Sequence, residues 1–245
     1  MKRYLLTGAA LAAAIGCAAT ADTQLHGYLP PGAIDGVRVI GPPPLEGSNQ
    51  ERADRATYLE TRALAGSPRW ARAIKDDDLW DGGAVSRLSC VMGVRLAAQT
   101  TPRTYRVLQQ IELDVRTVGL QPKKAFNRTR PFMDNDLPIC IARGDWMKGN
   151  ASYPSGHSMT GWAWGLVLSE LAPDKTGPLM EAGGAIGDSR FICGVHYRSD
   201  VEAGRRLGAA MVARLHADAE FQKDLAAARQ ELRHIHTAAP ADCPA

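Results

Sequence analysis

The alternation of apolar and polar positions along the chain predicts a mostly helical protein. Apolar residues recur every three or four positions, which is the spacing of amphipathic helices. This spacing predicts helices over the ranges 51–65, 85–98, 105–118, 157–171, 179–192, 200–219 and 221–234. A further helix is expected at Ser67-Pro68, where a capping serine precedes a proline at the first helical position. No stretch shows the alternation of a strand, so we expect an all-α, single-domain helical bundle.

Proline and glycine mark the places where these helices should stop. Residues 22–48 are rich in both and predict an irregular arm. Residues 121–155 contain four prolines and several glycines and predict a long loop. Pro173 should end the helix over 157–171, and Gly183-Gly184 should break the helix that follows. We therefore expect the longest irregular segment in the middle of the domain.

The first 21 residues have the order of features of an export signal. Lys2 and Arg3 form a basic region, residues 5–15 form an apolar run, and Ala19-Thr20-Ala21 forms a small-residue cleavage site. The apolar run is shorter than the roughly 20 residues that span a bilayer. We therefore expect cleavage after Ala21 and an exported domain over the remaining residues, 22–245.

Charge and cysteine content limit what this domain binds. The chain has a net charge of +3 and loses two basic residues with the signal, so a near-neutral domain gives no reason to expect nucleic acid as a partner. No later segment is apolar enough to be an integral membrane segment. Lipid attachment at Cys17 and a buried N-terminal helix are the alternatives to simple cleavage. Four cysteines remain, which predicts two disulfides with three possible pairings and no zinc site: Cys90, Cys140, Cys193 and Cys243.

Three short segments contain the basic residues, histidines and Ser-Gly turn that a phosphate-binding site would use. They are Lys123 to Arg130-Pro131, then Pro154-Ser155-Gly156-His157, then Ser189-Arg190 followed by His196 and Asp200. Taken singly, they are most simply explained as surface charges, a turn before a helix, and a His–Asp pair on a helix surface. Only the three segments together indicate a functional site.

Together these residues supply what phosphoryl transfer requires without a metal or another cofactor. Lys123, Arg130 and Arg190 are three cations for a phosphate dianion. Ser155 and Gly156 lie at a predicted helix N-terminus, where backbone N–H groups and the helix dipole favour an anion. These groups can neutralise the charge that a metal would otherwise neutralise in the transition state.

Two histidines divide the remaining chemistry. Asp200 lies one helical turn after His196, or just across a loop-to-helix junction from it, and can accept one ring N–H so that the other nitrogen attacks phosphorus. We therefore predict that His196 is the nucleophile and forms a phosphohistidine. His157 is then the general acid for the leaving oxygen, and in the second step it activates water.

The pattern K-x6-RP, PSGH and SR-x5-H-x3-D resembles the signature of the phosphatidic acid phosphatase type 2 superfamily. That superfamily includes bacterial acid phosphatases, lipid phosphatases and vanadium-dependent haloperoxidases. Residues 28–31, 152–158, 187–190 and 196–205 are similar to the class A bacterial non-specific acid phosphatases, and the resemblance covers most of residues 28–220. It implies a helical bundle with the active site at helix ends, in a periplasmic enzyme that is often a homo-oligomer.

The resemblance also implies a role for each motif residue. The phosphate-binding positions are matched by Lys123, Arg130, Ser155, Gly156 and Arg190, the acid by His157, the nucleophile by His196 and its partner by Asp200. Glu112 stands eleven residues before the motif lysine, where the family can place an acidic residue of the substrate pocket. An exposed face of the helix over 105–118 is the alternative position for Glu112.

The leading hypothesis is therefore a periplasmic acid phosphatase that hydrolyses small phosphate monoesters with broad specificity. Phosphate should inhibit it, and so should vanadate, which adopts the geometry of the transition state. The alternatives are vanadate-dependent halide oxidation, transfer of the phosphoryl group to alcohols, and a non-catalytic phosphate-binding module. Binding alone would need neither the second histidine nor the aspartate, and the missing membrane segments disfavour a lipid phosphatase.

Overall fold

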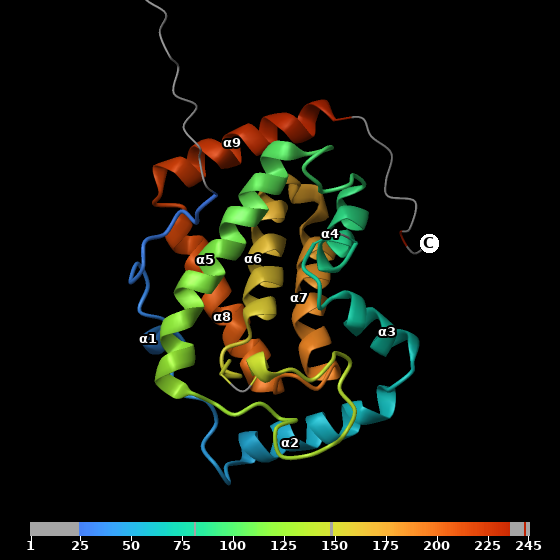
Figure 1. Cartoon of the computed structure of the whole chain (residues 1–245). Coiled ribbons are helices and arrows are strands. Elements are labelled where there is room, and N and C mark those ends of the chain that lie inside the picture. Colours follow the sequence, from blue (N-terminus) through green and yellow to red (C-terminus); the bar gives the residue numbers. More distant parts are fainter. Residues whose placement is uncertain (1–24, 81, 148, 236–242, 244–245) are drawn as a thin grey trace, which may run out of the picture.

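A computed structural model of the chain describes residues 25–80, 82–147, 149–235 and 243, and its regular elements over these residues are all helices. Four helices run side by side as a bundle: α5 (Pro102–Phe126), α6 (Gly156–Leu171), α7 (Thr176–Ile192) and α8 (Arg198–Leu215). Figure 1 shows α9 (Ala219–His234) across one end of this bundle and α2 (Asn49–Thr61) across the other. The predicted all-α, single-domain bundle is confirmed.

The remaining elements are short and lie around the bundle. They are α1 (Gly36–Ile40), α3 (Pro68–Lys75), α4 (Ala84–Met92) and 3₁₀ turns at Arg62–Leu64, Asp145–Met147 and Pro173–Lys175. Ser48, Ser67 and Ser155 cap α2, α3 and α6, because each side chain accepts a hydrogen bond from a backbone N–H three residues later. Pro68 follows Ser67 at the start of α3, as predicted.

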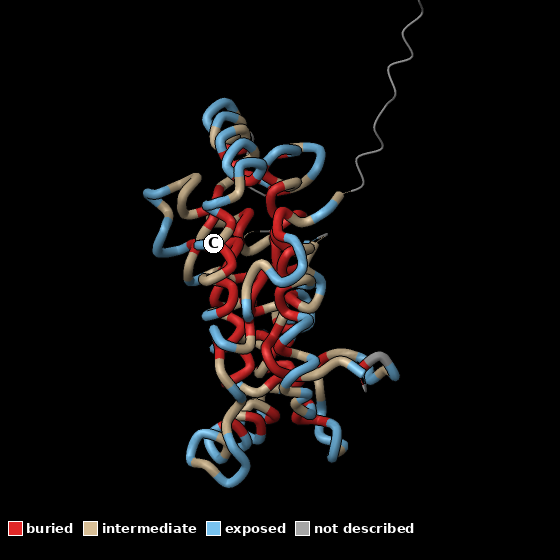
Figure 2. Tube along the Cα trace, turned by 90° about the vertical axis from the view of Figure 1, so that its left-hand side faces the viewer, coloured by how far each residue is buried: buried red, intermediate tan, exposed pale blue. Residues whose placement is uncertain are grey.

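The core is dense because α6 packs closely on α7 and α8. Gly161 of α6 faces Gly183 of α7, and a Cβ at Gly161 would lie 2.6 Å from the Gly183 carbonyl oxygen. Large buried side chains fill the rest of the core, among them Met159, Trp164, Leu168, Ile186 and Leu207. Figure 2 shows buried positions along the length of the bundle, with exposed positions concentrated at its ends and loops. This packing gives the site a rigid scaffold.

The predicted boundary between helix and loop near residue 120 is wrong. The helix expected over 105–118 is α5, which continues to Phe126 with Pro122 inside it, so the loop expected over 121–155 begins later. A proline there gives up one helical hydrogen bond. Helix α1 packs against this turn, and a Cβ at Gly36 would crowd the Pro122 ring at 3.2 Å. Tertiary packing therefore keeps the last turn helical and places Lys123 on a helix.

Several further helix bounds differ from the prediction, among them the end of the helix predicted over 200–219, which stops at Leu215. Helix α7 is not broken at Gly183-Gly184, because the close packing on α6 offsets the roughly 1 kcal/mol that a glycine costs inside a helix. The helix predicted over 85–98 ends early, since Gly93 takes the left-handed conformation (φ 72°) that terminates helices. The arm predicted to be irregular over 22–48 contains the short α1.

Two disulfides form, as the cysteine count predicted, and the structure gives their pairing as Cys90–Cys243 and Cys140–Cys193. The second joins the loop between α5 and α6 to the end of α7, and a hydrogen bond from the Cys140 N–H to the Cys193 carbonyl (3.1 Å) reinforces it. The predicted signal over residues 1–21 lies outside the described residues. Among the described helices, none has the length and apolar character needed to cross a membrane.

Candidate active site

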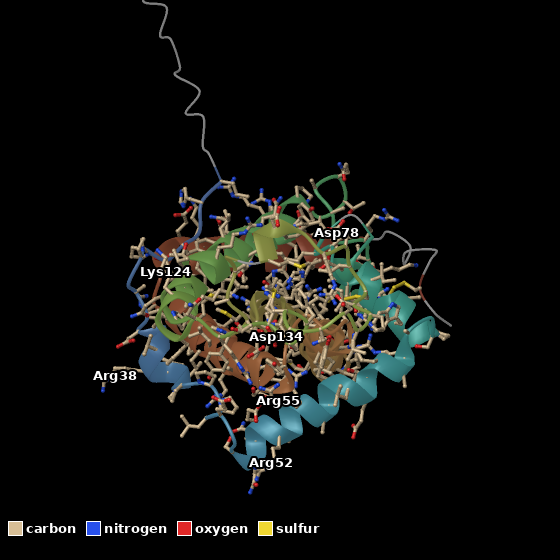
Figure 3. The ribbon with its side chains drawn as sticks, turned by 60° about the horizontal axis from the view of Figure 1, so that its bottom comes forward. Arg38, Arg52, Arg55, Asp78, Lys124 and Asp134 are labelled. Atoms are coloured by element: carbon tan, nitrogen blue, oxygen red, sulfur yellow. A yellow bond between two sulfur atoms is a disulfide. The ribbon has the colours of Figure 1, made fainter. Side chains whose placement is uncertain are left out.

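Four helix ends meet at the end of the bundle that α2 covers, and the three motifs lie on them (Figure 1). Lys123 lies on the last turn of α5, Ser155 and Gly156 at the start of α6, Arg190 on the last turn of α7 and Asp200 on the first turn of α8, while Arg130 and His196 lie in the adjoining loops. Figure 3 looks onto this end, with Asp78 and Lys124 on its rim. The expected position of the site at helix ends is therefore where the motif residues gather.

His196 lies buried between two groups of opposite charge. Its Nδ1 is 3.4 Å from Asp200 Oδ2, and its Nε2 is 3.3 Å from Arg130 Nη1. Asp200 lies across a loop-to-helix junction, the second of the two geometries considered from the sequence. Burial, followed by the nearby charges of Arg130 and Lys123, holds the pKa of His196 well below its usual value. This shift favours the neutral ring, whose Nε2 faces Arg130.

Asp200 is fully buried and accepts more hydrogen bonds than the sequence indicated. Its Oδ2 accepts from Ser152 Oγ (2.5 Å) and from the Tyr197 backbone N–H (2.8 Å), so it also helps to cap α8. Its Oδ1 accepts from Arg128 Nη1 (2.6 Å). A buried carboxylate needs such donors to remain charged. The contact with His196 is longer than these bonds, and contacts of this kind tighten in reacting complexes.

Arg128 and Ser152 are site residues that the sequence reasoning missed. One signal could have found Arg128. Residues two apart in an extended segment point to the same side, and Arg128 lies two before Arg130. Both arginines are at least partly buried, whereas Thr129 between them is exposed. The sequence offered no comparable signal for Ser152.

The three predicted cations converge on one buried region. Lys123 Nζ donates to the Ala151 carbonyl (2.5 Å), and Arg130 donates to the carbonyls of Asn150 (2.8 Å) and Val195 (3.0 Å). Burial, and then the neighbouring Arg130, lowers the pKa of Lys123 to about 7. Burial, and then Arg190, lowers the pKa of Arg130 to about 10. Cations that lower each other's pKa in this way mark a place where an anion is favoured.

Arg190 carries an available donor. Its side chain is 3% exposed and its Nη1 donates to Asp77 Oδ1 (2.7 Å). Its Nε is buried and has no hydrogen-bond partner within the part of the chain that the structure describes. A buried guanidinium with an unpaired N–H is costly unless it meets an acceptor, so this donor suits a phosphate oxygen.

His157 stands beside Arg190 at the start of α6. Its Nε2 lies 2.8 Å from the backbone carbonyl oxygen of Asp77, the residue whose carboxylate pairs with Arg190. Burial, and then the charge of Arg190, shifts the pKa of His157 below its usual value, while Asp77 opposes that shift. Asp77 thus contacts both a predicted phosphate ligand and the predicted acid, a role that sequence reasoning missed.

A cavity of about 540 Å³ opens beside His157. Lys123, Gly156, Trp80 and Glu112 contribute to its wall. Glu112 is 7% exposed and pairs with Arg116 Nε at 2.6 Å, so its alternative position on an exposed helix face is wrong. Its role in binding the leaving group stays a prediction.

Comparison with known proteins agrees with the motifs. The model of the PAP2 superfamily matches residues 112–223. The chain is 36% identical over 207 residues to an acid phosphatase of Zymomonas mobilis, covering 84% of this chain and 78% of that protein. It is 36% identical over 205 residues to a non-specific acid phosphatase of Providencia stuartii (83% of each) and 35% identical over 219 residues to one of Salmonella typhimurium (87% and 86%). The chain therefore belongs to the PAP2 superfamily and, within it, to the non-specific acid phosphatases.

Proposed function

We propose that residues 22–245 form the catalytic domain of an exported acid phosphatase, which hydrolyses small phosphate monoesters in the periplasm through a phosphohistidine at His196. The predicted signal over residues 1–21 supports export. The single observation that carries the mechanism is the position of His196, whose Nδ1 faces Asp200 while its Nε2 faces Arg130.

In the first step, the phosphate group binds between Lys123, Arg130 and Arg190, with the backbone N–H groups at the start of α6 as further donors. Nε2 of His196 attacks phosphorus, so that an N–P bond forms as the P–O bond to the leaving group breaks. His157 donates its proton to the departing oxygen. Asp200 stabilises the positive charge that appears on the His196 ring.

In the second step, water attacks the phosphohistidine. His157, now unprotonated, takes a proton from the water, an O–P bond forms, and the N–P bond to His196 breaks. Inorganic phosphate leaves and both histidines return to their first states. Phosphate competes for the same cations, and vanadate occupies them in the trigonal-bipyramidal geometry of the transition state, so we expect both to inhibit.

The pKa shifts support activity at acidic pH. The lowered pKa of His196 keeps it unprotonated, and hence nucleophilic, where an ordinary histidine would be charged. His157 must instead be protonated to act as the acid. A bound phosphate dianion opposes the effect of Arg190 and Arg130 on His157, so substrate binding raises the pKa of this ring and recruits the proton.

The charge of the site supports a mechanism without a metal. The groups that converge on it are the cations of Lys123, Arg130 and Arg190, which attract an anion and repel a divalent cation. They take the place that Mg²⁺ has in other phosphoryl transfers.

The test is hydrolysis of p-nitrophenyl phosphate with and without EDTA by the wild type, His196→Asn, His157→Asn and a control, His216→Asn. His216 is an exposed ring paired with Glu170, so its variant should keep wild-type activity. We expect EDTA to have no effect and His196→Asn to be inactive. His157→Asn should lose more activity on an alkyl phosphate than on p-nitrophenyl phosphate, because a poor leaving group depends more on the acid. Activity in His196→Asn would overturn the proposal. Loss of wild-type activity on adding EDTA would also overturn it.

Transfer to alcohols is a second candidate, because the cavity beside His157 and Lys123 has room for an alcohol next to the proposed general acid. Added glycerol should then yield glycerol phosphate at the expense of free phosphate. The homo-oligomer that the family resemblance implies is tested by light scattering of the purified protein.

A further inference from the structure

Arg128 joins two buried carboxylates behind the nucleophile. Its Nη1 donates to Asp200 Oδ1 (2.6 Å), and its Nη2 donates to Asp54 Oδ2 (2.9 Å) on helix α2. The side chains of Arg128, Asp54 and Asp200 are 11%, 4% and 0% exposed. At this burial a charge is strongly disfavoured unless it is paired. Arg128 therefore supplies the opposite charge that both buried carboxylates need.

The same cluster fixes the start of α8. Asp54 Oδ1 accepts from the Ser199 backbone N–H (2.9 Å), and its Oδ2 accepts from Ser199 Oγ. Arg128 Nη1 also donates to Ser199 Oγ (2.7 Å), and its guanidinium lies over the Tyr197 ring at 4.2 Å. Each of these contacts lies within a few residues of Asp200. Helix α2 is thus tied through Asp54 to the turn that carries both His196 and Asp200.

Arg128 acts on only one oxygen of Asp200. Oδ1 faces Arg128, whereas Oδ2 faces Ser152, the Tyr197 N–H and the His196 ring. An arginine suits this task because its planar fork can reach two carboxylates at once with defined geometry, which a lysine cannot. The arrangement therefore sets the rotation of the Asp200 carboxylate.

We propose that Arg128 and Asp54 are positioning residues for the nucleophile, which orient the Asp200 carboxylate toward His196 during turnover. This inference rests on the proposed function, since it presupposes that His196 becomes phosphorylated. The phosphorylated ring keeps a proton on Nδ1 and carries positive charge, so it needs a carboxylate, and not a neutral acid, at Asp200. Without Arg128, Asp200 Oδ1 loses its guanidinium donor and the carboxylate is free to rotate away from the ring.

The test compares Arg128→Met, Arg128→Lys and Asp54→Asn with a matched control, Arg205→Met. Arg205 also bridges two carboxylates, Asp188 and Glu202, and lies over an aromatic ring, but these partners lie outside the site. For each variant, kcat and KM for p-nitrophenyl phosphate are measured per folded enzyme across pH. The rate of phosphoenzyme formation is measured by rapid quench.

We expect Arg128→Met to lower kcat by about 10- to 100-fold, the range found when the outer hydrogen-bond partner of a metal-ligating histidine is removed. KM should stay unchanged, because Arg128 does not face the phosphate cations. Arg128→Lys should recover part of the lost kcat. The kcat of Asp54→Asn should lie between those of wild type and Arg128→Met, and Arg205→Met should have the wild-type kcat.

A purely structural role predicts a different result. Arg128→Met would then have fewer folded molecules but the wild-type kcat per folded enzyme, which would overturn the inference. If Arg128→Met does not fold, Arg128→Lys and Asp54→Asn decide, and a wild-type kcat per folded enzyme in both rejects the inference. A wild-type enzyme that forms no phosphohistidine would overturn the proposed function itself. Normal phosphoenzyme formation in wild type and variants alike would overturn only the inference.

Discussion

The two disulfides should contribute differently to stability and to activity. Removing Cys90–Cys243 should cost more stability, whereas removing Cys140–Cys193 should cost more activity. The two cysteines of Cys140–Cys193 are 53 positions apart in the sequence, and those of Cys90–Cys243 are 153 positions apart. A cross-link restricts the unfolded chain more as the enclosed loop grows. By the loop-closure relation, the shorter link contributes about 4 kcal/mol to the free energy of unfolding and the longer about 5 kcal/mol.

Activity should depend on the shorter link. Cys193 lies three residues before His196, and Cys140 lies in the loop that carries Arg130. Cys90 lies on α4, remote in sequence from the motifs. Cleaving Cys140–Cys193 frees one loop from the turn that holds the nucleophile, and small displacements of reacting groups are costly in rate.

The assay pairs thermal unfolding with kcat per folded enzyme for Cys140→Ala/Cys193→Ala and Cys90→Ala/Cys243→Ala. The first should lower Tm by roughly 8–16 °C and the second by roughly 10–20 °C. Only the first should lower kcat. Equal kcat losses in both variants would refute the structural reasoning about the site. A larger Tm loss on removing Cys140–Cys193 would refute the loop-length reasoning.

Three further predictions concern pH and backbone strain. Because the pKa of Lys123 is lowered to about 7, phosphate affinity should fall as pH rises through that value, and kcat/KM of Lys123→Met should lack this limb. Gly194 and Gly66 both have a positive φ, 81° and 80°, but a Cβ at Gly194 would collide with Arg62, whereas a Cβ at Gly66 would meet open space. Gly66→Ala should therefore lower the free energy of unfolding in urea by about 1–2 kcal/mol, and Gly194→Ala should lower it by more. Burial raises the pKa of Asp114 to about 6, so the folded state favours its protonated form. Its contribution to stability should fall as pH rises from about 4 to about 6, and Asp114→Asn should flatten this change in Tm, whereas an unchanged slope would contradict it.

The helix start at Ser155 and the closeness of His196 to Asp200 could be predicted from the sequence, because each depends on a short stretch of chain. Ser155 caps a helix, His157 follows in its first turn, and Asp200 follows a short turn after His196, all within one or two turns of chain. Their convergence could also be expected, since only a common anion explains their residue types together. The order of the helices followed from the spacing of apolar residues for the same reason.

What the sequence missed depends on packing between distant segments. Arg128 meets Asp54 across 74 positions, and Asp77 meets Arg190 across 113. The extension of α5 past Pro122 depends on α1, and the unbroken α7 depends on the close approach of α6. Local propensity favours a loop or a break at these places, and burial against another helix reverses that preference.

The central claim is that His196 carries the phosphoryl group during turnover. The most direct measurement mixes wild-type enzyme with p-nitrophenyl phosphate, quenches it in alkali within the first turnover, and locates the phosphoryl group by mass spectrometry of the peptides. The account predicts a phosphohistidine at His196, formed at a rate no slower than kcat and absent from His196→Asn. A phosphoryl group on another residue, or full turnover with no phosphorylated peptide, would contradict it.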